Sequence, residues 1–288
     1  MASFKSVPLK RLLAIGCEVL YREASAAIAQ SPCIVDIEYM RKSLHDIGEG
    51  PMSSRLQARI ELSLASRTPD AWPDAVVLLY GLCNNGIRGL HAPVPIVVPR
   101  AHDCITLLLG SRARYDKHFQ ANPGTFYRSP GWIERDSDPD ANPASVTSRL
   151  GITHDYAKLA EKYGEDNAKY LMETMGDWFK HYCRLCLIDT GVGSCETYRT
   201  ICQDQVKAKN WTYDEIAGDT VLLRKLLCGD WDEQDFLILQ PGQKIAASND
   251  ARVICADVDL DDDHGWYHSS AALATCPQQQ QQTEPLAA

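Results

Sequence analysis

The sequence predicts an α/β protein made of two Rossmann-like lobes with parallel sheets and a cleft between them. Short apolar runs, each typical of a buried strand, alternate with segments of helical spacing, and this alternation predicts parallel sheets joined by right-handed crossovers. The length of 288 residues accommodates one large α/β domain or two smaller halves. Residues 121–150 are rich in proline, glycine, aspartate and serine, which favours a long loop or a crossover between two lobes.

The first half of the chain alternates strand and helix. The run Ala75–Tyr80 is apolar almost throughout, which is typical of a strand covered on both faces. The segment Met52–Ser66 instead places apolar residues at helical spacing with charges between them. In chain order, the expected elements are strand Leu12–Gly16, helix Tyr21–Gln30, strand Ile34–Tyr39, helix Met52–Ser66, strands Ala75–Tyr80 and Pro95–Pro99, and a helix beginning with Ile105–Leu109.

The second half repeats the alternation. Asp219 is a good N-cap for a helix over Thr220–Leu227, and Gly229 suits the end of that helix. The other expected elements are helices His154–Tyr163 and Glu165–Tyr182, strand Leu185–Asp189, helix Glu196–Lys207, and strands Trp211–Ile216 and Phe236–Leu239. The predicted division is an N-terminal lobe over residues 1–130 that carries the Cys/His site, a C-terminal lobe over 131–255, and an acidic, then glutamine-rich, disordered tail over 256–288.

The bulk composition restricts the kinds of partner. The net charge of −9 argues against a broad surface for nucleic acid or an anionic membrane, and no apolar run reaches the length that spans a bilayer. Lys10 and Arg11 before a short apolar run loosely imitate a signal peptide, but Glu18 and Arg22 interrupt the pattern and favour a strand. The eleven cysteines are odd in number and irregularly spaced, so we expect free thiols in a reducing cytoplasm.

Four residues with metal-binding side chains follow predicted strands. Cys17, His45, Cys83 and Cys104 each lie just past a strand, and His102 lies two residues before Cys104. Because the carboxyl ends of parallel strands meet at one edge of a sheet, we expect these side chains to converge. Three thiolates and one imidazole suit tetrahedral Zn²⁺, whereas three thiolates alone suit a [4Fe-4S] cluster with one open iron. The alternative is that each cysteine is a buried thiol and each histidine only bonds to a loop.

Two weaker patterns lie in the second half. Gly191, Gly193 and Ser194 form a turn between a predicted strand and helix, where backbone N–H groups could bind a phosphate or carboxylate. A tight turn without a ligand explains the same glycines. Cys183 and Cys186 form a CxxC pair, but residues three apart on a strand face opposite sides, so the pair is a poor candidate for metal binding.

Several strings of this sequence resemble one known family. They are YGLCNNG at Tyr80–Gly86, PRAHDCI at Pro99–Ile105, PGTFY at Pro123–Tyr127 with PGW at Pro130–Trp132, DTG at Asp189–Gly191, Gly218–Asp219 with LLRKLL at Leu222–Leu227, and DFLI at Asp235–Ile238. Together they resemble an uncharacterised bacterial and archaeal family, classed as a domain of unknown function, over roughly residues 10–245. That family is often encoded beside corrinoid-dependent methyltransferases for methylamines and betaines.

The resemblance carries expectations about the site and the metabolism. It implies cysteine at positions 17, 83 and 104 and histidine at 45 and 102, which this chain has. The chain departs from the family just after Cys17, where Glu18–Tyr21 replaces small residues, and this affects the expected floor of the pocket. The resemblance also implies corrinoid-linked one-carbon metabolism, with a corrinoid reached through a partner protein.

Three functions compete at this stage. The first is an enzyme of methyl transfer or demethylation that uses the bound metal, with Glu18 or Asp103 as the acid or base. The second is a non-catalytic accessory protein that binds and delivers a metal or a corrinoid. The third is a small-molecule binding protein with incidental thiols. We expect a small-molecule substrate, and the sequence leaves the oligomeric state open.

Overall fold

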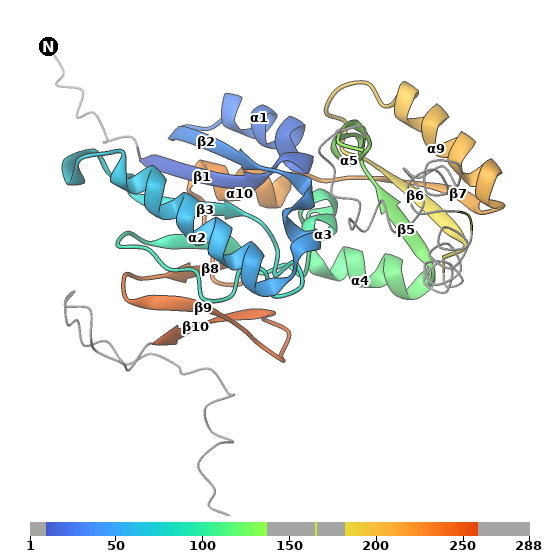
Figure 1. The fold of residues 1–288 in the computed structure, drawn as a ribbon. Helices are drawn as coiled ribbons and strands as arrows, with labels where there is room; N and C mark the ends of the chain where they lie inside the picture. Colours follow the sequence, from blue (N-terminus) through green and yellow to red (C-terminus); the bar gives the residue numbers. More distant parts are fainter. Residues whose placement is uncertain (1–9, 137–164, 166–181, 259–288) are drawn as a thin grey trace, which may run out of the picture.

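The computed structural model describes residues 10–136, Glu165 and residues 182–258, and its strands form two main sheets and a small hairpin (Figure 1). Sheet A has five strands in the order β2-β1-β3-β4-β8. Sheet B has three strands in the order β5-β6-β7, and β9 pairs with β10 in an antiparallel hairpin near β8. None of the helices in the described part of the chain is long and apolar enough to cross a membrane.

The elements have the following bounds. The strands are β1 (Arg11–Cys17), β2 (Ile34–Met40), β3 (Ala75–Leu79), β4 (Ile96–Pro99), β5 (Thr125–Arg128), β6 (Arg184–Asp189), β7 (Thr212–Ala217), β8 (Phe236–Leu239), β9 (Gln243–Ala247) and β10 (Ile254–Val258). The α-helices are α1 (Tyr21–Ala29), α2 (Glu49–Ala65), α3 (Cys104–Leu109), α4 (Arg112–Ala121), α5 (Pro130–Glu134), α9 (Glu196–Lys209) and α10 (Val221–Cys228). The 3-10 helices are η1 (Glu18–Leu20), η2 (Lys42–Ile47) and η3 (Pro69–Ala71).

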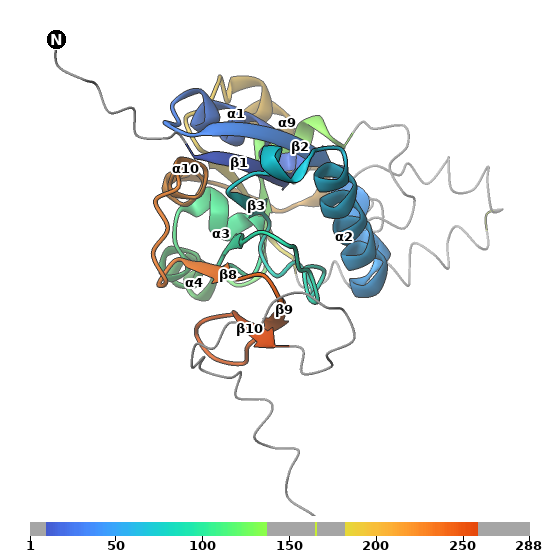
Figure 2. The ribbon, with the colours of Figure 1, turned by 90° about the vertical axis from the view of Figure 1, so that its left-hand side faces the viewer.

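Sheet A is covered on both faces, which explains its continuous apolar strands. Leu12 and Ala14 of β1 belong to a core that includes residues of α1, α3 and α10, whereas Leu13 and Ile15 belong to a second core with residues of α2. Figure 2 shows α2 on one side of the sheet and α3 and α10 on the other. Strands β1 to β4 are parallel, so β1, β3 and β4 end at the same edge, close to sheet B.

Sheet B is parallel throughout and is packed differently on its two faces. Leu185 and Leu187 of β6 pack with Cys202 and Val206 of α9. Cys186 lies on the opposite face of β6 and belongs to the core of sheet A. The two sheets therefore share one apolar core, although each sheet has its own helices.

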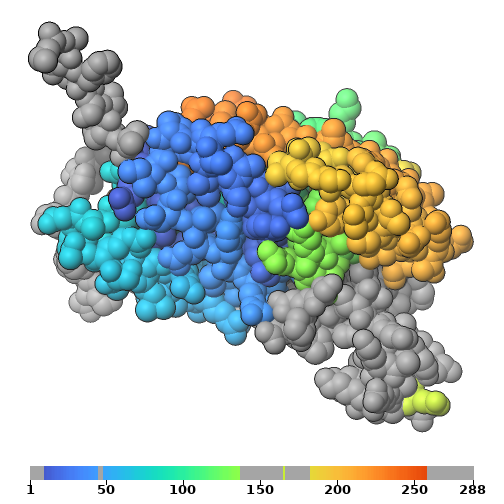
Figure 3. Space-filling model, turned by 90° about the horizontal axis from the view of Figure 1, so that it is seen from above, coloured from blue at the N-terminus to red at the C-terminus, as the bar shows by residue number. Residues whose placement is uncertain are grey.

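Helix α5 brings the two sheets into contact at η1. A Cβ atom on Gly131 would overlap the carbonyl oxygen of Val19, so only glycine allows this approach. Figure 3 shows the green segment that contains α5 between the blue N-terminal residues and the yellow and orange residues of the second half of the chain. This contact lies beside the carboxyl end of β1.

The predicted α/β class with parallel sheets is confirmed, with two differences. The structure has β5 and α5 inside the segment that was predicted as a loop, residues 121–150, and the rest of that segment from 137 lies outside the described residues. Strand β8 runs antiparallel to β4 in sheet A, although it lies within residues 131–255 of the predicted C-terminal lobe. The cleft and the domain boundaries stay predictions.

The predicted elements of the second half are mostly present. The strand at Phe236–Leu239 is confirmed residue for residue, and the strands near 185–189 and 211–216 are confirmed within one residue. The predicted helices at 154–163 and 165–182 lie outside the described residues, apart from the helical Glu165 and the C-terminal residue Tyr182. Residues 256–258, predicted as the start of the tail, instead belong to β10, because they pair with β9.

Candidate functional site

Three cysteines follow adjacent strand ends at one edge of sheet A. Cys17 is the last residue of β1, Cys83 lies four residues after β3, and Cys104 begins α3 after β4. The loops after β3 and β4 are joined by two hydrogen bonds of 2.8 Å, from Leu82 N–H to the Ala101 carbonyl and from Cys83 N–H to the His102 carbonyl. We call Cys17, Cys83 and Cys104 the three-thiol site.

A glycine permits the close approach of these two loops. A Cβ atom on Gly81 would lie 2.5 Å from the backbone nitrogen of Asp103, which is closer than side chains tolerate. The loop that carries Cys83 is also strained. Cys83, Asn84 and Asn85 adopt the left-handed region in succession, with φ of 47°, 55° and 65°. This conformation costs about 1–2 kcal/mol per residue, although asparagine tolerates it better than cysteine does. Backbone strain of this kind is concentrated at functional sites.

The three thiols are close enough to influence one another electrostatically. Burial raises the pKa of Cys83, and negative charge on Cys17 and Asp103 raises it further. Burial likewise raises the pKa of Cys104 well above its ordinary value, with further contributions from Asp103, Cys83 and Cys17. In the absence of a cation, both thiols are therefore neutral at physiological pH. A bound cation would favour their thiolate forms and would displace the protons.

The thiols have polar neighbours on several sides. Trp132 Nε1–H of α5 donates to Cys104 Sγ at 3.4 Å, so sheet B contributes a group to the three-thiol site. The phenol of Tyr80 is buried, and its hydroxyl has no hydrogen-bond partner within residues 10–136 and 182–258. Charges on Cys17 and Cys83 raise the Tyr80 pKa, after the larger effect of burial, so the phenol lies near both sulfurs. An unsatisfied buried hydroxyl beside two thiols indicates a place where a bound group would accept a hydrogen bond from it.

Asp103, a predicted acid or base, has a structural role as well. Its Oδ1 accepts from the N–H groups of Ile105 at 3.0 Å and Thr106 at 3.3 Å, so it is the N-cap of α3. Tyr115 O–H donates to its other oxygen at 3.3 Å. Burial raises the Asp103 pKa above its usual range. A carboxyl group with a raised pKa beside Cys104 can hold a proton close to the thiols.

The other predicted residues of this site are placed differently. Glu18 Oε1 accepts from the backbone N–H of Lys42 at 2.8 Å, and its Oε2 lies 3.6 Å from Arg135 Nε, so the carboxylate is already paired. His102 is exposed to solvent. The backbone of His45 lies in η2 after the carboxyl end of β2, but its side chain lies outside the described part of the structure. The structure therefore gathers the three cysteines and Asp103, and does not place a described imidazole among them.

The predicted anion-binding turn lies at the carboxyl end of β6. Gly191 and Gly193 have φ of 71° and 81°, and Ser194 is exposed. An open cavity of about 420 Å³ adjoins the turn and is lined by Asp189, Gly191, Glu215 and Ala217. Its two carboxylates would repel an anion, although Arg199 pairs with both of them. The binding of an anion by Gly191, Gly193 and Ser194 stays a prediction.

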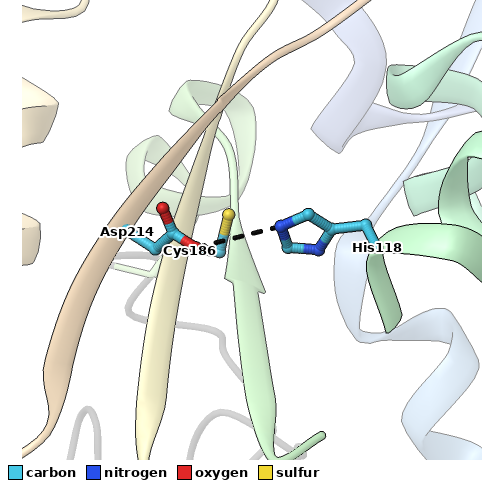
Figure 4. A group of neighbouring side chains, drawn as sticks. All are labelled: His118, Cys186 and Asp214. Carbon is cyan, nitrogen blue, oxygen red and sulfur yellow. Dashed lines mark ion pairs between the residues drawn. The ribbon is translucent and has the colours of Figure 1, made fainter. Parts of the chain in front are cut away.

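The structure also gathers three donor groups that were not predicted together. His118 of α4, Cys186 of β6 and Asp214 of β7 place one ligand atom each within 4.8 Å of the other two (Figure 4). Among the residues that the structure describes, no other group of three such atoms is this compact, so the sulfurs of the three-thiol site are spread more widely. Cys186 belongs to the CxxC pattern, but the other cysteine of that pattern, Cys183, is exposed and is not one of the three grouped residues.

Comparison with known proteins gives one match. A family model described as protein of unknown function (DUF1638) matches residues 40–227. Neither the curated proteins nor the solved structures contain a match to the chain. The matched region includes Cys83 and Cys104 and all three residues of the His118 group, whereas Cys17 precedes it.

Proposed function

The chain belongs to the family described as protein of unknown function (DUF1638), and we propose that this member binds a [4Fe-4S] cluster through Cys17, Cys83 and Cys104. The observation that carries the proposal is the convergence of three mutually interacting thiols at the ends of three adjacent strands. Three cysteine ligands leave one iron of such a cluster open to a small molecule.

The spacing of the thiols favours a cluster over a single zinc ion. Zinc–sulfur bonds of about 2.3 Å in a tetrahedron bring the sulfurs within about 3.8 Å of one another. The three sulfurs of this site do not all lie within 4.8 Å of one another. A cluster places several atoms between its cysteine ligands and tolerates a wider spacing. The buried Tyr80 hydroxyl, which lacks a partner among the described residues, would then face the bound group.

The surrounding residues would tune and protect this site. The Trp132 N–H group that donates to Cys104 Sγ would stabilise negative charge on that sulfur. Asp103 would exchange a proton beside the thiols, with Tyr115 orienting its carboxyl group. Cys83, Cys104 and Cys186 are thiols that take no part in a disulfide, which suits the reducing cytoplasm that we propose for this protein.

We propose further that the site serves methyl transfer or demethylation in corrinoid-linked one-carbon metabolism. The support is the resemblance of the sequence to a family encoded beside corrinoid-dependent methyltransferases. A bound cluster would supply an open iron that holds the heteroatom of the substrate. The residues of the chain would exclude water from that position and would exchange a proton through Asp103.

Elemental analysis and visible spectroscopy test the proposal. The full chain, purified without oxygen, should be brown and contain iron and sulfide in equal amounts, at close to four of each per chain. Cys83→Ser should remove the colour, whereas Cys33→Ser should retain it, because Cys33 precedes β2 and therefore lies at the opposite edge of sheet A from Cys17. A colourless protein with about one zinc per chain, which Cys83→Ser loses, would show that the three-thiol site holds zinc and not a cluster. Iron that is retained in Cys83→Ser would overturn the site.

Turnover separates an enzyme from an accessory protein. The loaded chain is mixed with a methylated amine and a purified corrinoid protein, and methylation of the corrinoid is followed by its absorbance. Turnover that Asp103→Asn abolishes without loss of iron supports the catalytic role. Binding of the corrinoid protein without turnover would instead identify an accessory protein.

A further inference from the structure

His118, Cys186 and Asp214 meet because of the register of sheet B. Tyr127 of β5 pairs with Cys186 of β6, and Cys186 pairs with Asp214 of β7. Directly paired residues of neighbouring strands point to the same face of a sheet, so these three side chains lie in a row. Helix α4 presents His118 to that row, as Figure 4 shows.

The geometry of the imidazole suits an ion between the side chains. Nδ1 of His118 lies 2.6 Å from the Tyr127 hydroxyl, a hydrogen bond that leaves Nε2 free to act as a ligand. Nε2 lies 3.8 Å from Asp214 Oδ2, which is too long for a hydrogen bond. Two metal–ligand bonds of about 2.1 Å span that distance at a wide angle.

The local charges also suit a divalent cation. Burial raises the pKa of Cys186 to about 12, so the thiol is neutral until a cation displaces its proton. Arg184 Nη1 lies 3.2 Å from Asp214 Oδ2, and both side chains are about one-third exposed, so solvent screens this pair. Asp214 Oδ1 accepts from Glu215 N–H at 2.8 Å, and this bond holds the carboxylate in place. Each carboxylate oxygen has a second lone pair available to a metal.

We propose that His118, Cys186 and Asp214 form a binding site for one zinc ion, separate from the three-thiol site. One nitrogen, one sulfur and one oxygen ligand match the donors that zinc takes in proteins. Three protein ligands leave a fourth position for water, which is the pattern of zinc sites that activate water or bind a substrate. Tyr127 acts as the positioning residue, because its hydroxyl fixes the orientation and tautomer of the imidazole.

Cobalt binding tests the site with the three-thiol site disabled. The full-length Cys83→Ser/Cys104→Ser chain is titrated with Co²⁺ under reducing conditions, since Co²⁺ replaces zinc and reports a thiolate ligand by its near-ultraviolet charge-transfer band. One Co²⁺ per chain should bind with this band, and zinc should displace it. In the same background, Cys186→Ser should abolish the band, whereas Tyr127→Phe should weaken the affinity by about tenfold or more.

Controls keep the outcome decisive. Cys202 is a buried thiol on the opposite face of sheet B, so Cys202→Ser in the same background should keep the band unchanged. If Cys186→Ser does not fold by circular dichroism, His118→Gln and Asp214→Asn supply the test, because both side chains are partly exposed. Absence of Co²⁺ binding in the starting background, or a band that survives the loss of His118 or Cys186, would overturn the site.

Discussion

Replacing Tyr80 by phenylalanine should stabilise the metal-free protein. The Tyr80 ring is 3% exposed, and its hydroxyl has no hydrogen-bond partner within the described ranges 10–136 and 182–258. A buried polar group without a partner costs about 1–3 kcal/mol, whereas phenylalanine keeps the ring and removes the hydroxyl. Allowing for the small void that is left, we expect a gain of about 1 kcal/mol in the free energy of unfolding. For a chain of this size, that gain raises Tm by about 2–4 °C.

The measurement is urea denaturation of the reduced, metal-free protein, followed by circular dichroism. Tyr127→Phe is the matched control, because the Tyr127 hydroxyl makes a 2.6 Å hydrogen bond to His118 and its loss should destabilise the protein by about 1–2 kcal/mol. If both substitutions destabilise the protein equally, the Tyr80 hydroxyl has a partner and the reasoning fails. In the cluster-loaded protein, the gain in stability from Tyr80→Phe should shrink or reverse, because the bound group would then accept a hydrogen bond from the Tyr80 hydroxyl.

Three further predictions follow from the same contacts. Gly81→Ala places a Cβ atom 2.5 Å from the backbone of Asp103, so it should cost about 1–3 kcal/mol by urea denaturation and lower the bound iron, whereas Gly50→Ala meets nothing within 4 Å and should do neither. Glu23 is buried, which raises its pKa, and only one of its oxygens has a partner among the described residues, the Thr190 hydroxyl at 2.8 Å. The folded protein therefore binds the Glu23 proton more tightly than the unfolded chain does, so the free energy of unfolding should fall as pH rises from the ordinary pKa of 4.5 to the raised value. Glu23→Gln should remove that fall. If the variant keeps the pH profile of the parent protein, Glu23 is not the group responsible. Because burial keeps Cys83 and Cys104 protonated without a cation, the affinity of the three-thiol site for a metal should rise about tenfold per pH unit for each proton released. Competition titrations at pH 6 to 8 that show no slope would argue against the raised pKa values of these two thiols.

Much of sheet A could be predicted because its strands are continuous apolar runs. A short, continuous apolar run such as Ala75–Leu79 is typical of a strand that is buried on both faces. When such strands are parallel, the residues after each strand lie at the same edge of the sheet. The positions of Cys17, Cys83 and Cys104 followed from that order alone. The exposure of His102 did not, because the direction of a loop side chain depends on how the loops pair.

Sheet B was harder to predict because its first strand is short. Thr125–Arg128 is four residues long and lies between Gly124 and Pro130, so turn residues dominate the local pattern. Unless β5 is recognised as a strand, the sequence does not show that Tyr127, Cys186 and Asp214 pair with one another. The meeting of these side chains with His118 depends on strand pairing and helix packing, which spacing along the chain does not encode.

The path of the chain between the sheets has a consequence for the architecture. Asp219 N–H donates to the Leu108 carbonyl at 2.8 Å, and a Cβ atom on Gly110 would lie 2.8 Å from Asp219 Cβ, so the chain leaves and re-enters the first unit at neighbouring points. The described residues of the intervening chain, 111–136 and 182–218, include all three strands of sheet B, whereas β1 to β4 before them and β8 after them form sheet A. The part of the chain that precedes residue 111 supplies all three sulfurs, and α5 of the intervening chain supplies the indole that bonds to Cys104. A change in the intervening chain would therefore leave the sulfurs in place while changing what surrounds them.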